Sequence, residues 1–209
     1  MRVLWLVCLT GALTCALSAG TIVFGNTGES GIGVDGVDAS FVGPLYDSFT
    51  SLDAAGQITD LQIVLSLCTE ENCPSSGTVD VGLYADSSTT PGTGSPLGSI
   101  SDTLLSDTPA TYDIPLTAFP VLTADTRYWI GLSGDTMAQW SYESDDSGIG
   151  VSGEFFDNQT GVSSDSIGPY QMQVTVTETT PEPASIFLFL TGAAILALFR
   201  RARHHSTAY

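Results

Sequence analysis

Basic residues are scarce in this chain of 209 residues. It has no lysine, five arginines and two histidines, against 23 acidic residues. All of the acidic residues lie between Glu29 and Glu182, where Arg127 is the one basic residue, so this stretch has a formal charge of −22. Such a surface repels phosphate, which excludes nucleic acid and anionic membrane surfaces as natural partners. It suits solubility, cations and neutral polysaccharide.

The shortage of histidine and cysteine limits the chemistry further. Residues 21–179 contain no histidine, and Cys68 and Cys73 are their only cysteines. Mechanisms of the Ser–His–Asp or Cys–His type need an imidazole, so most hydrolases are excluded, and a zinc site lacks its ligands. In an exported chain the two cysteines are expected to form a disulfide that closes a tight loop. A glycoside hydrolase needs only two carboxyl groups and is left as an alternative.

Long apolar runs occur only at the two ends of the sequence. At the start, Arg2 precedes the apolar run 3–17, and the small residues Ser18, Ala19 and Gly20 follow it. This order is typical of a signal peptide, here predicted over residues 1–20, so the chain is expected to be exported.

The second apolar run belongs to a distinctive C-terminal tail. Residues 184–199 carry no charge and as a helix would span about 24 Å, enough for a transmembrane helix if the flanking arginine reaches the interface. Arginines 200, 201 and 203 follow directly, which places this end in the cytoplasm and the preceding domain outside. The sequence therefore predicts an exported domain, residues 21–179, and an anchoring tail, residues 180–209.

The tail also resembles a known sorting signal. Its motif is Pro181, Glu182 and Pro183, then the apolar helix, then Arg200, Arg201 and Arg203. This order resembles the PEP-CTERM signal of exopolysaccharide-producing Gram-negative bacteria. The resemblance implies recognition by an exosortase in the inner membrane, with the helix as an anchor before sorting, and a final location at the cell surface or in the extracellular matrix.

The intervening domain has the sequence pattern of an all-β protein. Apolar and polar residues alternate with a period of two, the pattern of half-buried strands, in residues 58–67, 78–84, 111–116 and 170–178. Residues 127–133 are more continuously apolar and are predicted to form a central strand, with 138–142 as a short strand and its candidate pairing partner. Residues 85–98 and 143–153 are predicted to be loops, since Gly, Ser, Pro and Asp dominate them. The expected fold is an antiparallel two-sheet β-sandwich, jelly-roll-like.

A second resemblance covers residues 45–176. It rests on the segments "YDSFT", "VDVGLYADSSTTPGT", "LTADTRYWIGLSG" and "GPYQMQV", with Trp140 between the last two. These resemble the choice-of-anchor R domain, a family of bacterial surface domains with interchangeable C-terminal anchors. The resemblance implies a surface location and brings no catalytic or ligand-binding residue with it.

Two groups of residues are candidates for binding, and each has a structural alternative. Trp140 and Tyr142 lie on a short polar segment, where they either stack on a sugar or pack into the core, whereas Trp129 is expected in the core. Glu143, Asp145 and Asp146 crowd a glycine-rich turn, where they either bind calcium or form an ordinary solvated turn. No cofactor is required by the sequence.

These features together favour a non-enzymatic surface or matrix protein associated with exopolysaccharide or a biofilm. The alternatives are the carboxylate-dependent glycoside hydrolase and an ice-binding protein. The latter is raised because a sorting tail of this kind also occurs on ice-binding proteins. Only the threonines of residues 175–180 approach the regular array that ice binding needs; Thr175 and Thr177 are expected to point away from the core, but one strand is too narrow for such an array.

Overall fold

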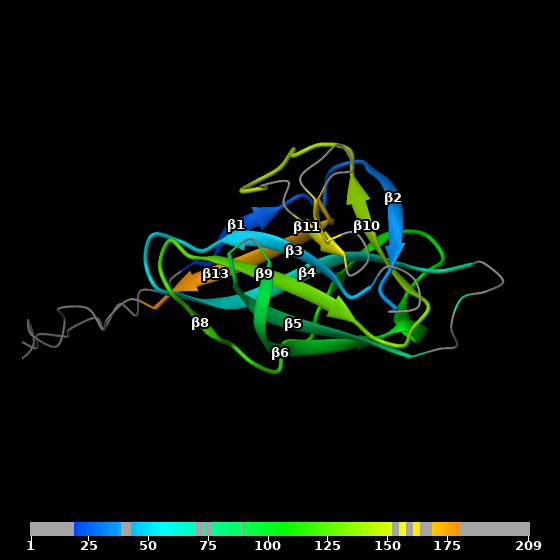
Figure 1. Cartoon of the computed structure of the whole chain (residues 1–209), viewed down its shortest axis with the longest axis horizontal. Helices are drawn as coiled ribbons and strands as arrows, with labels where there is room; N and C mark the ends of the chain where they lie inside the picture. The colour runs from blue at the N-terminus through cyan, green and yellow to red at the C-terminus, as the bar shows by residue number, and fades with distance from the viewer. Residues whose placement is uncertain are drawn as a thin grey trace, which may run out of the picture.

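The structure is a computed structural model that describes residues 19–38, 43–69, 73, 77–88, 90–151, 155–157, 161–163 and 169–179. These residues form two antiparallel sheets without an α-helix, so the all-β, two-sheet prediction is confirmed (Figure 1). No helix in these ranges is long and apolar enough to cross a membrane. The predicted signal peptide up to residue 18, the Pro181–Glu182–Pro183 motif, the helix over 184–199 and the arginine cluster lie outside the described residues.

Sheet A has the strand order β1-β13-β4-β10-β2, and β7 and β8 also pair with β4. Its members are β1 (Thr21–Gly25), β2 (Gly31–Gly36), β4 (Gly56–Leu67), β7 (Ala110–Asp113), β8 (Val121–Leu122), β10 (Ala138–Glu143) and β13 (Met172–Glu178). The long strand β4 organises this sheet because four other strands pair along its length.

Sheet B has the order β12-β11-β3-β9-β5-β6. Its members are β3 (Leu45–Thr50), β5 (Thr78–Asp86), β6 (Pro91–Ser101), β9 (Arg127–Ser133), β11 (Phe155–Asp157) and β12 (Gly161–Ser163). The strand predicted at 127–133 is confirmed as an internal strand, since β9 lies between β3 and β5. A short 3-10 helix, Asp102–Leu104, follows β6.

The core lies between the inner faces of the two sheets. Along β4 the side chains of Leu61, Ile63 and Leu65 are fully buried, while Asp60 and Gln62 on the opposite face are partly exposed. The facing residues of sheet B are the alternate apolar residues of β3, β5 and β9. The period-two pattern thus predicted correctly which side of β4 packs against the core. Removal of this apolar surface from water stabilises the sandwich by about 25 cal/mol per Å² of buried area.

One segment predicted to be a loop is a strand. Residues 91–101 form β6, whereas the Gly-, Ser- and Pro-rich composition of 85–98 predicted a loop. Among the described strands β6 is the last of sheet B and pairs with β5. Proline is tolerated in such a strand because one side of its backbone needs no donor. The pairing is irregular near Pro91 and Pro96, and the buried Leu97 and Ile100 attach β6 to the core.

Three other strand predictions need correction. The predicted pairing between the strand at 138–142 and β9 is wrong, because β10 pairs with β2 and β4 in sheet A, while β9 belongs to sheet B. The strand predicted over 111–116 ends at Asp113, since Pro115 cannot continue the hydrogen-bond ladder. In the segment 170–178 the strand begins at Met172, and Tyr170 instead forms an isolated bridge with Tyr142.

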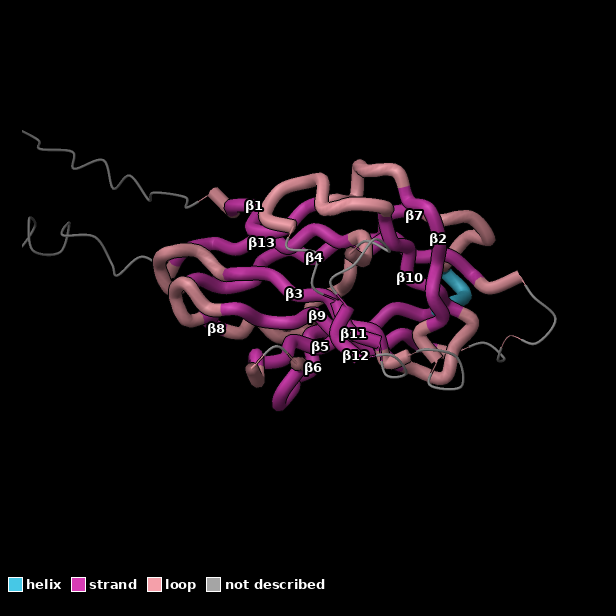
Figure 2. The backbone as a smooth tube through the Cα atoms, turned by 45° about the horizontal axis from the view of Figure 1, so that its top comes forward, coloured by secondary structure: helices cyan, strands magenta, loops and turns pink. Residues whose placement is uncertain are grey.

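The two ends of the described domain lie together. Thr21 of β1 pairs with Val176 of β13, and Figure 2 shows β2 and β10 at the opposite end of the molecule from β8. The predicted disulfide between Cys68 and Cys73 is present, with a Cα–Cα distance of 6.1 Å. It closes the start of the connection from β4 to β5.

Candidate functional site

A groove runs over the outer face of sheet A, away from the core. It has a volume of about 540 Å³, within the usual range of ligand-binding pockets, and is formed by β2, β4, β7, β10 and adjacent loops. We call it the outer groove; its lining includes Glu29, Ile32, Ser66, Asp107, Gln139 and Gln171. Because these residues come from five distant parts of the sequence, no local motif predicted the groove.

Glycine in β2 keeps the floor of the outer groove open. A Cβ atom on Gly31 would lie 2.7 Å from the hydroxyl oxygen of Ser141 and 2.8 Å from the amide oxygen of Gln171. Such distances are too short for a side chain, so residue 31 must lack one for β2 to lie this close. Beneath this glycine Ser141 is buried, while Gln139 of β10 is partly exposed in the outer groove.

The lining of the outer groove is suited to hydroxyl-rich ligands. The amide nitrogen of Gln171 donates to the carbonyl oxygens of Glu29, at 2.8 Å, and Asn26, at 3.2 Å, which fixes the orientation of this amide. Gln171 is itself buried, so the groups within reach of a ligand are the partly exposed amide of Gln139 and the exposed carboxyl groups of Glu29 and Asp107. Ile32 is 57% exposed and gives the groove an apolar side. Amides, carboxylates and one apolar surface are the groups that hydrogen-bond and pack against a sugar.

The aromatic residues predicted to bind sugar lie elsewhere. Trp140 is fully buried, stacks on Tyr170 at 4.7 Å between ring centroids, and donates its indole N–H to the carbonyl oxygen of Gln171 at 2.9 Å. Its ring is therefore core, and its assignment to sugar binding is wrong. Tyr142 is half-buried, contacts Tyr170 edge-on and lies against Gly33.

The three acidic residues predicted to bind calcium differ in burial. Glu143 is buried, and its Oε1 accepts a hydrogen bond of 2.8 Å from the amide of Asn26, whereas Asp145 and Asp146 are exposed. Asp145 caps the turn by accepting from the backbone N–H of Ser147, and hydrogen bonding to Ser147 lowers the pKa of Asp145. Within the described ranges, no three His, Cys, Asp or Glu side chains are grouped so as to hold a metal ion.

A further buried acid, Asp47 on β3, was not singled out by the sequence. Its side chain is fully buried, and burial raises its pKa well above the usual value for aspartate. Hydrogen bonds from the backbone of Ser48 and Tyr170 act in the opposite direction, and the negative charges of Glu143 and Asp146 raise the pKa further. The only available signal was an acid at an inward-facing position of the segment "LYDSF", between Leu45 and Phe49.

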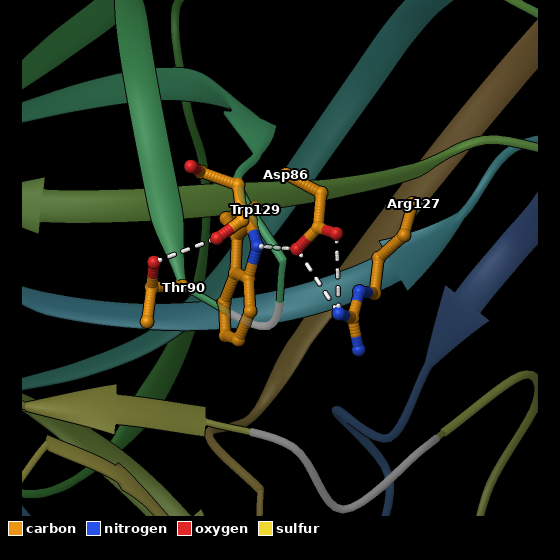
Figure 3. Close-up of polar contacts among 5 residues, drawn as sticks. Asp86, Thr90, Arg127 and Trp129 are labelled. Carbon is orange, nitrogen blue, oxygen red and sulfur yellow. Dashed lines mark hydrogen bonds and ion pairs between the residues drawn. The ribbon is translucent and has the colours of Figure 1, made fainter.

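Trp129 is buried as expected but outside the main core cluster. Figure 3 shows Asp86 between the indole of Trp129 and the guanidinium of Arg127. The indole N–H donates to Asp86 Oδ1 at 2.9 Å, and the guanidinium forms an ion pair with the same carboxylate at 3.1 Å. Arg127 also lies over the indole ring at 5.5 Å from its centroid. This cluster connects the end of β5 to β9.

Sheet B has a smaller hollow on its outer face. It measures about 270 Å³ and is lined by Asp80, Tyr84 and Ser133 with parts of β6. Tyr84 contacts Tyr46 edge-on at 5.0 Å, and burial together with Tyr84 raises the pKa of Tyr46 to about 12. Tyr84 thus lines a surface hollow, unlike Trp140.

Two of the threonines behind the ice-binding alternative, Thr175 and Thr177, lie on the outer face of sheet A. Thr175 and Thr177 alternate with buried Val174 and Val176, so their predicted orientation is confirmed. The hydroxyl group of Thr177 is 3.2 Å from that of Thr59 on β4.

The site and fold define an antiparallel two-sheet sandwich with polar hollows on both outer faces. Comparison with protein-family models gives no match, and no curated protein is significantly similar to the chain. The similarity to PEP-CTERM and choice-of-anchor R proteins therefore stays a prediction.

Proposed function

We propose that this protein is a non-enzymatic, exported surface or extracellular-matrix protein that binds neutral exopolysaccharide in the outer groove. The observation that carries the proposal is the groove itself, about 540 Å³ in volume and lined by amide, hydroxyl and carboxyl groups around the exposed Ile32. The strongly acidic composition favours an uncharged polymer over an anionic one.

The terminal sequences support the route to the surface. In this proposal residues 1–20 direct export, and the tail of residues 180–209 anchors a jelly-roll-like sandwich in the inner membrane through the helix 184–199 until an exosortase acts near Pro181. The described domain suits such an anchor because Thr21 and Val176 are paired at one end, while β2 and β10 lie at the other (Figure 1). An anchored molecule would direct the outer-groove end away from the membrane.

The proposal is tested by affinity electrophoresis of the exported protein in gels containing dextran, galactomannan or mixed-linkage β-glucan. We expect at least one neutral polymer to retard the protein. Gln139→Ala should weaken binding by about 3- to 10-fold, the usual effect of losing one hydrogen bond. Ile32→Ser should also weaken it, because the sugar loses its apolar contact.

Two variants outside the outer groove serve as matched controls. Gln173→Ala removes the same amide from the outer face of β13, and Val121→Ser removes an apolar side chain that is 63% exposed on β8. Both should bind like the wild type. A protein that none of these polymers retards would contradict the proposal. Release of reducing sugar, lost in Glu29→Gln or Asp107→Asn, would instead establish the glycoside hydrolase alternative.

A further inference from the structure

Two carboxyl groups with no counter-charge among their described contacts are buried at one end of the sandwich. Asp47 projects inward from β3 and is 0% exposed, and Glu143 at the end of β10 is 1% exposed. They come from different sheets and are linked through Tyr170, whose backbone hydrogen-bonds to Asp47 and whose carbonyl oxygen accepts from the same Asn26 amide as Glu143. The two acids are far apart in the sequence, and neither neighbourhood alone suggests the pair.

The surrounding groups hold one oxygen of each carboxyl group in place. The backbone N–H of Ser48 donates to Asp47 Oδ1 at 2.7 Å. The amide nitrogen of Asn26 donates to Glu143 Oε1 at 2.8 Å and to the carbonyl oxygen of Tyr170 at 3.2 Å. Asn26 itself is fixed, because its oxygen accepts from the backbone N–H of Met172 at 2.8 Å. The network meets the lining of the outer groove at Gln171, whose amide donates to the carbonyl oxygen of Asn26, but its two carboxyl groups are buried.

The other oxygen of each carboxyl group, Asp47 Oδ2 and Glu143 Oε2, is buried without a hydrogen-bond partner. A buried carboxylate without partners is strongly unfavourable, so such oxygens are normally paired, protonated or bound to a metal ion. Arg127 is the one basic residue of the exported domain, and it forms its ion pair with Asp86. Within the described chain, no cationic side chain neutralises the two acids.

We propose that Asp47 and Glu143 bind a divalent cation of the calcium type between the two sheets. The two carboxylates together balance the charge of one such ion, and calcium takes oxygen ligands, including carbonyls and water, in flexible geometry. This assignment keeps Glu143 from the sequence-based calcium prediction but replaces the exposed Asp145 with the buried Asp47. Asp146, whose charge acts on both acids, adds to the negative potential that attracts the ion.

The test uses the exported protein after treatment with a chelator, with calcium chloride as the probe and magnesium chloride for comparison. We expect saturable calcium binding by calorimetry. At calcium about 100-fold above the Kd, the unfolding temperature should rise by roughly 5–10 °C, since the ion binds only the folded chain. Asp47→Asn and Glu143→Gln should each lower the calcium affinity at least about tenfold.

The stability of the same variants shows whether they lose calcium binding only because they unfold. Without calcium, Asp47→Asn and Glu143→Gln should be more stable than the wild type, because each replaces a buried acid, which must be either charged or protonated, by a neutral amide of similar shape. The matched control Asp145→Asn neutralises an exposed acid close in sequence and should bind calcium like the wild type. The proposal is overturned if calcium does not raise the unfolding temperature. It is also overturned if Asp145→Asn abolishes binding while Asp47→Asn leaves it intact.

The calcium experiments contain no polysaccharide, so their outcome does not depend on whether the protein binds sugar as proposed above. A protein that binds calcium through Asp47 and Glu143 but is not retarded by any neutral polymer would keep the cation site and contradict the sugar-binding proposal.

Discussion

At the scale of single residues, Glu143 shows how burial changes the chemistry of an acid. Burial raises the pKa of Glu143 from 4.5 to about 7, although the hydrogen bond from Asn26 acts in the opposite direction. The charges of Asp145, Glu29 and Asp146 raise it further. Burial also raises the pKa of Asp47 well above its usual value, so without a cation the folded chain favours the uncharged form of both acids.

This pKa leads to a prediction about pH in the presence of a chelator. The folded state holds the proton of Glu143 more tightly than the unfolded chain does, so its stabilising contribution is complete below about pH 4.5. The contribution is lost as the pH rises through about 7, and amounts to about 3 kcal/mol. Glu143→Gln should therefore gain stability relative to the wild type over this range, measured by urea unfolding.

The control for this prediction is Asp145→Asn. The pKa of Asp145 is lowered in the folded protein, so its contribution is present above the unfolded value and is lost as the pH falls. The stability difference between this variant and the wild type should change with pH in the opposite direction. A Glu143→Gln variant whose stability follows that of the wild type from pH 4.5 to 7 would contradict the assigned burial.

The sequence predicted the identity of several important residues but not their surroundings. The sequence allows Trp140 to be either a core residue or a sugar contact, because its alternation with polar neighbours fits both positions. What decides is Tyr170, which stacks on Trp140 from 30 residues further along the chain. Asp47 was missed for the same reason, since its importance depends on Glu143 in the other sheet.

At the scale of elements, the sequence predicts a strand most clearly where one face of the strand is buried and the other is exposed. The strand β4 alternates strongly because one face is core and the other is solvent-facing. The strands β2 and β6 were not found, since their glycines and prolines carry little apolar signal and the hydrogen bonds of the neighbouring strand fix their conformation.

The disulfide at the end of β4 gives a prediction at this scale. Reduction, or the double substitution Cys68→Ala and Cys73→Ala, should lower the free energy of unfolding by about 2 kcal/mol, because the short loop regains freedom in the unfolded chain. The sheet should persist, since the backbone N–H of Cys68 donates to the carbonyl oxygen of Met137 at 2.7 Å. Denaturant unfolding and far-ultraviolet circular dichroism measure the two effects.

The reduced wild type is the control for the double variant, and both should lose the same stability. Complete loss of the β-sheet signal on reduction would contradict this account, because it would mean that the disulfide, rather than the paired strands, holds the end of β4 in place.

At the scale of the whole molecule, the charge is so one-sided that it should decide the class of polymer bound. The formal net charge of the chain is −18, and the described domain has Arg127 as its one basic residue. Repulsion between exposed charges acts over about 10 Å at 0.1 M salt and about 3 Å at 1 M salt. A neutral polymer is not subject to this repulsion, whereas an anionic polymer is.

Dextran and dextran sulfate test this expectation, because they share a backbone and differ in charge. If dextran is a polymer that the protein binds, its affinity should stay nearly constant between about 0.05 M and 0.5 M salt. Dextran sulfate should bind more weakly at low salt and gain affinity as salt is added, because screening reduces its repulsion from the acidic surface. Tight binding of dextran sulfate at low salt that weakens as salt is added would show that the acidic surface does not select the polymer. A local site would then have to overcome the field of the whole molecule, and Arg127 is the only residue of the domain whose positive charge could contribute to it.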